Sequence, residues 1–270
     1  MSKRETGWTE TKIAKYQKEK RGQGELKNYK PWLTIQDVPS EGRSHRFMGW
    51  KTNREHHFFS DLEFNYLCIV DWTSDVIDVR EQYPLDRIVT LKIAEELGIN
   101  HPTDPKTGTP IVMTTDFLLT LRIDNGLVYK ARTIKPSSKL NEERIIMKFE
   151  IERIYWERQG VDWGIVTEKE MPSPIVDNIK YLRNSYLIDE KLNIKDFLEE
   201  WIYFNGELIQ NLKYFDEKYN NNPGTGISIY RHLLARKVLL VDMNKIIDLK
   251  ENVKNIKINK NYVDSEERLA

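Results

Sequence analysis

Apolar residues recur at helical spacing after residue 60, and the spacing then changes to strict alternation. The run Ser60-Asp-Leu-Glu63 has the form of a capping box, and the apolar positions behind it return every three or four residues. We therefore expect a helix over residues 61–71. The alternating run that follows, closed by Pro84, predicts a strand over residues 76–83.

Two alternating runs within residues 111–136 flank an Asn-Gly dipeptide at positions 125–126. Asn-Gly favours a two-residue hairpin loop, because a type I′ turn needs positive φ at both central residues. With this loop, Asp116 is expected opposite Lys135. Side chains alternate along a strand, so Asp116, Thr133 and Lys135 should share one face of the sheet unless a bulge breaks the register.

A further helix and strand complete this part of the chain. Ser137 or Ser138 is expected to cap a long helix that stops at Gly160, and the next alternating run predicts a strand over residues 161–167. A strand-helix-strand connection leaves its two strands parallel, with a right-handed crossover. The predicted order is α-β-β-β-α-β, an α/β fold.

The two ends of the chain differ from this middle. The first 60 residues contain one expected helix, over residues 9–20, and then an irregular stretch that we interpret as an arm. A linker at Met171-Pro-Ser-Pro174 is followed by mostly helical sequence. The expected helices span residues 175–182, 194–202, 208–219 and 227–237, and a small hairpin joins residues 238–243 to 246–249. We expect two domains, residues 1–169 and 170–270, the second one winged-helix-like.

Composition places the chain among ordinary globular proteins, with 39% apolar and 31% charged residues. No apolar run approaches the roughly 20 residues that cross a bilayer, and the N-terminus has no secretory pattern. We expect a cytoplasmic protein without a membrane partner. Cys68 is the single cysteine and lies in an apolar run, which excludes a disulfide framework and a thiolate zinc cluster.

Charge is balanced overall but not along the chain. The 42 Lys and Arg residues equal the 42 Asp and Glu residues. Residues 1–60 hold 13 basic against 7 acidic residues, a net of +6, whereas residues 61–170 hold 14 against 20, a net of −6. A nuclease could use this division to bind phosphates with one part and metal with the other. Ordinary scatter of surface charge explains the distribution equally well.

The strongest chemical candidate is Asp116 together with Thr133-Ile-Lys135. Phosphodiester cleavage needs an activated water and a group that stabilises charge on the phosphate. The Asp116 carboxylate and the Ile134 carbonyl can ligate a divalent cation, and Lys135 can orient the water or contact the phosphate. The alternative is a cross-strand salt bridge on a solvated face of the sheet.

Other candidate residues have simpler explanations. Glu63 can serve as the partner of Ser60 in the capping box, and we expect that role to exclude metal binding by the same carboxylate. Adjacent His56 and His57 point apart and have no further partner at zinc-ligand spacing. The sequence has no Gly-rich phosphate loop, so any ATP-driven step belongs to a partner protein.

The acidic residue on a helix, Asp116 and the Thr133-x-Lys135 run together resemble the signature of the restriction-endonuclease superfamily. The surrounding residues resemble one branch, the TnsA family of transposon endonucleases, over most of residues 20–185. The segments that carry this resemblance are Arg21-Gly-Gln-Gly, Pro31-Trp-Leu-Thr-Ile-Gln-Asp-Val-Pro39, Gly42-Arg-Ser-His-Arg46, His56-His57 before Ser60-Asp-Leu-Glu63, Asp78-Val-Arg-Glu-Gln-Tyr-Pro84, Thr115-Asp116-Phe117, Lys135-Pro136 and Glu152-Arg-Ile-Tyr-Trp156.

The resemblance implies a restriction-endonuclease-like αβββαβ core in which Glu63, Asp116 and Lys135 are the catalytic residues. It also implies Mg²⁺ or Mn²⁺ as cofactor, with Glu63, Asp116, Thr133 and Ile134 around the metal. One position departs from the family pattern, because relatives typically carry Gln or Glu where this chain has Thr133. A hydroxyl is neutral and shorter, so a water is a plausible intermediary between Thr133 and the metal.

The same resemblance implies a role in DNA transposition. The chain would hydrolyse the 5′ ends of a transposon, while a TnsB-type transposase cuts and joins the 3′ ends. A TnsC-type AAA+ ATPase would dock on the C-terminal domain. Two alternatives remain open at this point: a free-standing nuclease or junction resolvase of the same fold, and a catalytically inactive DNA-bridging subunit.

Overall fold

The computed structural model describes residues 7–37, 43–124, 126–187 and 192–259. The chain divides into two compact units, Met1–Met171 and Pro172–Ala270. The predicted linker lies at this division. Within the described residues, no helix is both long and apolar enough to span a lipid bilayer.

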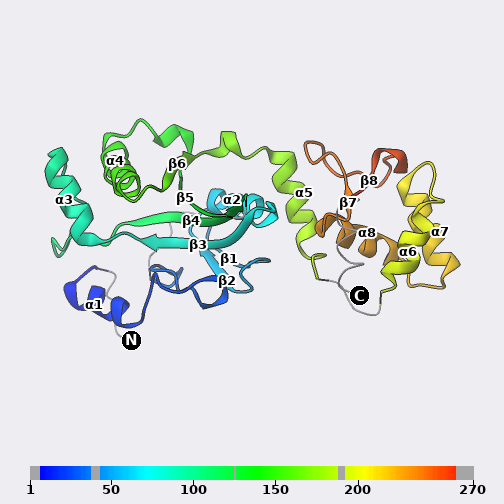
Figure 1. Cartoon of the computed structure of the whole chain (residues 1–270), viewed down its shortest axis with the longest axis horizontal. Coiled ribbons are helices and arrows are strands. Elements are labelled where there is room, and N and C mark those ends of the chain that lie inside the picture. Colours follow the sequence, from blue (N-terminus) through cyan, green and yellow to red (C-terminus); the bar gives the residue numbers. More distant parts are fainter. Residues whose placement is uncertain (1–6, 38–42, 125, 188–191, 260–270) are drawn as a thin grey trace. The chain divides into compact units, whose positions relative to one another are not determined.

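Within its described residues, the first unit contains four α-helices and six strands, labelled in Figure 1. Its elements are α1 (Glu10–Lys18), β1 (His45–Met48), β2 (Glu55–Phe58), α2 (Asp61–Trp72), β3 (Val76–Pro84), α3 (Arg87–Leu97), β4 (Thr114–Ile123), β5 (Gly126–Ile134), α4 (Glu143–Arg158) and β6 (Asp162–Val166).

A four-stranded mixed sheet with the order β3-β4-β5-β6 forms the centre of this unit. The first three strands are antiparallel, and β6 is parallel to β5. This topology confirms the predicted α-β-β-β-α-β order and the parallel crossover through α4. The helix α3, between β3 and β4, and the separate β1-β2 pair were not predicted.

Apolar side chains fill the space between the sheet and the helices α3 and α4. Leu118 and Ala131 lie opposite each other in the β4-β5 ladder, and both belong to this cluster. The cluster also contains Ile93 of α3 and Trp156 of α4. In Figure 1, α4 lies over one side of the sheet, and α1 with the β1-β2 pair lies on the other side.

The opposite face of the sheet meets β2 and α2. Phe117, the residue before Leu118 in β4, points to this other face. Its ring stacks there on Phe58 with centroids 5.6 Å apart. Tyr66 of α2 meets the same ring edge-on at 5.0 Å. These contacts hold the first turns of α2 against the sheet and so place Glu63 near β4.

The register predicted for the β4-β5 hairpin is wrong by two residues. Ile123 pairs with Gly126, and Leu118 pairs with Ala131 rather than with Thr133. Asp116 is therefore not opposite Lys135, which lies just beyond the end of β5. The turn uses Asp124, whose φ of +46° is left-handed, as its first central residue. Position 125 lies outside the described residues.

The predicted start of the long helix is also wrong. Ser137 begins a short 3-10 turn, and α4 starts only at Glu143. The main-chain nitrogen of Ser137 donates to Glu168 at 2.9 Å, and its hydroxyl donates to the same carboxylate. This serine therefore binds the segment after β6 instead of capping the helix. The predicted stop at Gly160 is confirmed by its φ of +66°.

The second unit is mainly helical, as predicted. It contains α5 (Ser173–Arg183), α6 (Ile194–Trp201), α7 (Leu208–Lys218), α8 (Thr225–Ala235), β7 (Leu239–Leu240) and β8 (Lys257–Ile258). Its core includes Phe197, which contacts the rings of both Trp201 and Phe215.

The hairpin predicted between residues 238–243 and 246–249 does not form, because β7 pairs with β8. The Asn178 side chain of α5 donates to the carbonyls of Met243 and Lys245 and accepts from the Ile247 nitrogen. These backbone groups are thus satisfied by a side chain rather than by a neighbouring strand. The winged-helix assignment of this unit stays a prediction.

Candidate active site

Glu63 occupies the first turn of α2 and is 8% exposed. Its main-chain nitrogen donates to the Ser60 hydroxyl oxygen at 3.2 Å, as the predicted helix cap requires. Its carboxylate accepts from the Ser60 hydroxyl at 2.8 Å and from the Phe59 nitrogen at 3.1 Å. The chain entering the helix therefore fixes the orientation of this carboxylate.

Asp116 is held by two donors from the neighbouring strands. Its Oδ1 accepts from the Gln82 amide at 3.1 Å, and its Oδ2 accepts from the Ile134 main-chain nitrogen at 2.8 Å. In a regular ladder, a main-chain nitrogen inside a sheet donates to a carbonyl of the next strand. Here the Asp116 carboxylate takes the place of that carbonyl.

The side chains of β4 do not alternate regularly between the two faces of the sheet around Asp116. Phe117 stacks on Phe58 of β2, whereas Thr115, two residues away, donates to Glu152 of α4 at 2.7 Å. Residues two apart on a regular strand point to the same face. Simple alternation therefore fails at this position, and the prediction of a shared face for Asp116 and Thr133 rested on it.

The two carboxylates, Glu63 and Asp116, lie close enough to affect each other. Burial raises the pKa of Glu63 to about 8, and the negative charge of Asp116 adds to this rise. Burial also raises the pKa of Asp116, against the lowering effects of the Ile134 nitrogen and the charge of Lys148. The charge of Lys135 lowers the pKa of both carboxyl groups. The structure thus brings the three residues singled out in the sequence into one electrostatic group.

The oxygens of this pair retain capacity for a cation. Each of the four carboxylate oxygens accepts one hydrogen bond from the groups named above, and a carboxylate oxygen has two lone pairs. A buried pair of like charges is also stabilised by a bound cation. Among the described residues, no cluster of three or more His, Cys, Asp or Glu side chains could hold a metal ion.

Comparison with known protein families decides the classification. A family model described as TnsA-like endonuclease N terminal matches residues 73–168, and one described as TnsA endonuclease C terminal matches residues 170–243. The chain is similar to the Transposon Tn7 transposition protein TnsA of Escherichia coli, with 43% identity over 182 residues, 67% of this chain. The chain belongs to the TnsA endonuclease family. The matched region spans 66% of that relative's length.

The first TnsA model includes Asp116 and Lys135 and begins after Glu63. The position that departs from the TnsA pattern, Thr133, is buried and directed toward α4. Its hydroxyl donates to the Oε1 of Glu152, which also accepts from Thr115. This contact uses the hydroxyl proton and leaves the lone pairs of the oxygen, so the role of Thr133 at a metal stays a prediction.

Glu152 is a site residue that the pattern analysis did not single out. Its side chain is fully buried beneath the ends of β4 and β5, and burial raises its pKa. The charge of Asp116 adds to that rise, so the two carboxyl groups are near each other. A signal existed in the sequence: Phe149, Glu152 and Trp156 lie on one helical stripe, and only Glu152 is charged.

His56 is held in a buried network of hydrogen bonds. The Nδ1 of His56 lies 2.7 Å from the Glu81 carboxylate, and its Nε2 lies 2.8 Å from the Thr52 hydroxyl. Arg54 donates to the same carboxylate at 2.7 Å. Although burial alone would raise it, His56 and Arg54 hold the pKa of Glu81 well below its usual range. This buried network ties β2 to β3.

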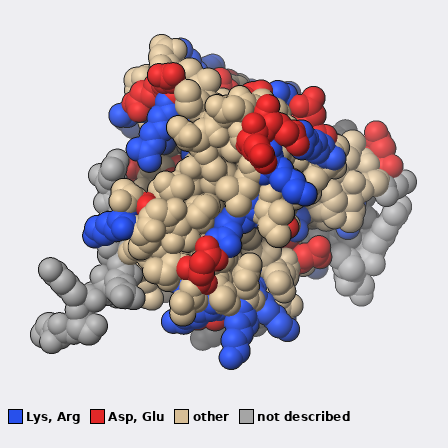
Figure 2. Space-filling model, turned by 90° about the vertical axis from the view of Figure 1, so that its left-hand side faces the viewer, with Lys and Arg blue, Asp and Glu red and all other residues tan. Residues whose placement is uncertain are grey.

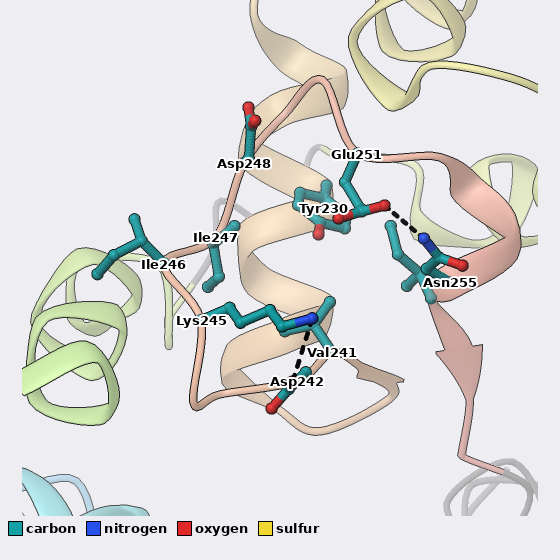
Figure 3. A pocket seen from close by; sticks show the side chains of 10 residues that line it. Tyr230, Val241, Asp242, Lys245, Ile246, Ile247, Asp248, Glu251 and Asn255 are labelled. Atoms are coloured by element: carbon teal, nitrogen blue, oxygen red, sulfur yellow. Dashed lines mark hydrogen bonds and ion pairs between the residues drawn. The ribbon is translucent and has the colours of Figure 1, made fainter. Parts of the chain in front are cut away.

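The second unit has its own cavity, of about 280 Å³, beside α8 (Figure 3). Lys245 pairs with Asp242 at 3.9 Å, and the Asn255 amide donates to Glu251.

Proposed function

We propose that this chain is the metal-dependent DNA endonuclease subunit of a heteromeric transposase. It would hydrolyse the 5′ ends of the transposon during cut-and-paste transposition, together with a TnsB-type transposase and a TnsC-type AAA+ ATPase. The observation that carries the proposal is the buried pair Glu63 and Asp116 beside Lys135: burial, and after it the charge of Asp116, raises the pKa of Glu63 to about 8. Membership in the TnsA family supports the same reading.

In this proposal, Glu63 and Asp116 hold a divalent cation, Mg²⁺ or Mn²⁺, with the Ile134 carbonyl as a further oxygen ligand. The chemistry that such a cation supplies is the activation of a water molecule and the neutralisation of charge on the phosphate. Thr133 acts indirectly, by binding Glu152.

The basic residues around the pair have separate tasks. Lys135, at the end of β5, contacts the scissile phosphate or the attacking water, where its positive charge stabilises the charge that develops. Lys148 lies one helical turn before Glu152 on α4, and its charge lowers the pKa of both Asp116 and Glu152. We assign Lys148 to a neighbouring phosphate of the DNA backbone.

The two units divide the work in this proposal. Residues up to about 169 form the catalytic domain and its arm. The remainder, as a winged-helix-like domain, contacts the AAA+ partner.

The decisive experiment compares Asp116→Ala with Asp75→Ala, a change of an exposed aspartate, in a transposition reaction with the partner proteins and Mg²⁺. We expect Asp116→Ala to abolish 5′-end cleavage and to accumulate joined replicon products, and Asp75→Ala to behave like the unchanged protein. Unaltered products with Asp116→Ala would favour an inactive bridging subunit. Nicking by the purified chain alone would favour a free-standing nuclease or resolvase.

A further inference from the structure

Gln82 adopts a backbone conformation that is unusual for its residue type. It lies in β3, is 4% exposed and has a φ of +48°. A non-glycine residue in the left-handed region is uncommon, and such residues cluster at functional sites. The β3-β4 ladder pairs Glu81 with Phe117 and Tyr83 with Thr115, so the kinked residue lies between these pairs, beside Asp116.

The kink aims the side chain of Gln82 at the carboxylate. Its Nε2 donates to the Oδ1 of Asp116 at 3.1 Å, and its Oε1 accepts from the Thr114 hydroxyl at 3.0 Å. The Thr114 hydroxyl satisfies the oxygen end of the amide, which leaves the NH₂ end facing Asp116. The amide therefore has one favoured orientation.

The N-terminal arm holds the kinked backbone from outside. The Trp32 main-chain nitrogen donates to the Gln82 carbonyl at 3.2 Å, and the Tyr29 hydroxyl donates to the Glu81 carbonyl at 3.1 Å. A Cβ at Gly22 would come within 2.1 Å of the Pro84 ring, so the arm also passes closely over the residue that ends β3. The arm thus contacts the backbone before, at and after Gln82.

From these contacts we infer that Gln82 is a positioning residue for the metal ligand Asp116. Its left-handed backbone, held by the arm, places the amide on Oδ1, while the Ile134 nitrogen holds Oδ2. With both oxygens fixed, the remaining lone pairs of Asp116 keep one direction. The inference rests on the proposed function, because it assigns Gln82 a task in presenting that ligand to the cation.

Two substitutions test the side-chain amide of Gln82 separately from its backbone conformation. Gln82→Gly removes the amide and adopts positive φ without strain, and Gln82→Met removes the donor but keeps a side chain of similar length. Gln159→Met is the control, because Gln159 is exposed after α4. We expect both Gln82 variants to bind Mn²⁺, followed by electron paramagnetic resonance in the full chain, about 10–100-fold more weakly than the control. The thermal stability of Gln82→Gly should not fall in proportion to its Mn²⁺ affinity, because glycine adopts the positive φ of this position without strain.

A crystal structure of metal-free Gln82→Gly provides a readout without any cation. We expect the Asp116 carboxylate to lose its single orientation and its contact with the Ile134 nitrogen. An unchanged carboxylate together with Mn²⁺ affinity within twofold of the control would overturn the inference. If the proposed function is wrong, the unchanged protein and Asp116→Asn should bind Mn²⁺ equally or not at all. In that case the crystal structure still decides whether Gln82 orients Asp116.

Thr114 offers a conservative pair for the same test. Thr114→Val removes the hydroxyl that orients the amide and should weaken Mn²⁺ binding, though less than Gln82→Gly does. Thr114→Ser keeps the hydroxyl and should restore the affinity of the unchanged protein. Equal affinity in the two Thr114 variants would contradict the proposed orientation of the amide.

Discussion

The carboxylate of Glu63 caps the start of α2 and lies near the Asp116 carboxylate at the same time. It accepts hydrogen bonds from the two residues that precede the helix, and it also lies within the field of Asp116. The expectation that capping excludes metal binding by the same carboxylate stays a prediction. Each oxygen uses one lone pair for the cap and keeps another for a cation.

The metal-free protein should be stabilised by Glu63→Gln at alkaline pH. The folded pKa of Glu63, about 8, exceeds its ordinary value of 4.5, so the folded state disfavours ionisation. This destabilisation is absent below pH 4.5, grows as the pH rises to 8, and is complete above that. At pH 9 we expect a gain of about 1 kcal/mol or more, roughly 2–4 °C in melting temperature, and little difference at pH 5.

Calorimetry of the metal-free protein provides the measurement, with Glu95→Gln as the control because Glu95 is exposed on α3. Mn²⁺ should reverse the order by stabilising the unchanged protein alone. Equal melting temperatures at both pH values would show that Glu63 carries no repulsion in the folded state.

Lys148 should contribute one phosphate contact to DNA binding. We expect Lys148→Gln to weaken binding similarly on all sequences and to reduce the salt dependence of the binding constant by about one unit of slope. Lys92→Gln, a change of an exposed lysine on α3, should leave the slope unaltered. Fluorescence anisotropy across a range of salt concentrations measures both, and an unchanged slope for Lys148→Gln would remove this residue from the DNA contact.

Single residues were predictable from the sequence where type and spacing were informative. Asp116 and Lys135 stood out through their hairpin, whereas Glu63 entered the candidate site through the family resemblance, with the helix cap as its simpler explanation. Gln82 did not, because a left-handed conformation at a glutamine follows from tertiary contacts such as the Trp32 hydrogen bond, and local pattern does not encode them.

At the scale of elements, the arm is an integral part of the first unit. Arg21 donates to the Asp37 carboxylate at 2.6 Å and to the Trp32 carbonyl at 3.1 Å, and Tyr16 donates to Asp37 at 2.7 Å. The Trp8 and Trp32 rings stack with centroids 6.3 Å apart. Because the Trp32 nitrogen also donates to the Gln82 carbonyl, loosening of the arm should alter the position of Gln82.

Docking of the arm should weaken in acid through Asp37. Although burial alone would raise it, hydrogen bonds from Thr34, Tyr16 and Arg21 hold the pKa of Asp37 at about 2, below its ordinary value of 3.8. Its contribution is therefore fully present above about pH 4 and is lost as the pH falls toward 2. Near-UV circular dichroism of the stacked tryptophans should change over this range.

The variant Asp37→Asn should show the weakened signal already at neutral pH, and it should lack the part of the acid change that belongs to this group. Asp75→Asn, at an exposed position, should retain the full transition. An identical acid profile in the unchanged protein and Asp37→Asn would exclude Asp37 as the group responsible.

Elements with strong local signals were predicted well, and their pairing was not. The helix expected over residues 61–71 appears as Asp61–Trp72, because its cap and apolar spacing are local. The β4-β5 register shifted by two residues, because packing of Leu118 against Ala131 selects it and two different turns fit the sequence. The helix α3 was overlooked although Asp86 caps it and Gly98 ends it.

At the scale of the molecule, charge is neutralised locally, which explains why composition says little about partners. Arg132 binds Asp162 at 2.7 Å, and Arg87 binds Glu10 at 2.7 Å, in each case across elements. On the face shown in Figure 2, acidic and basic side chains are interspersed rather than separated. The net charge counted over residues 1–60 therefore does not identify a basic patch on the surface.

The first unit should keep the proposed metal site without the second. Glu63, Asp116 and Lys135, and the hydrogen-bond partners described for the two carboxylates, all lie before Met171. The apolar cluster under the sheet is likewise complete within that unit. We expect a chain that ends at Met171 to unfold cooperatively and to bind Mn²⁺ as tightly as the full chain, while losing stimulation by the AAA+ partner. Calorimetry and Mn²⁺ titration test the first two points, and a truncated chain that folds but no longer binds Mn²⁺ would mean that the second unit completes the site.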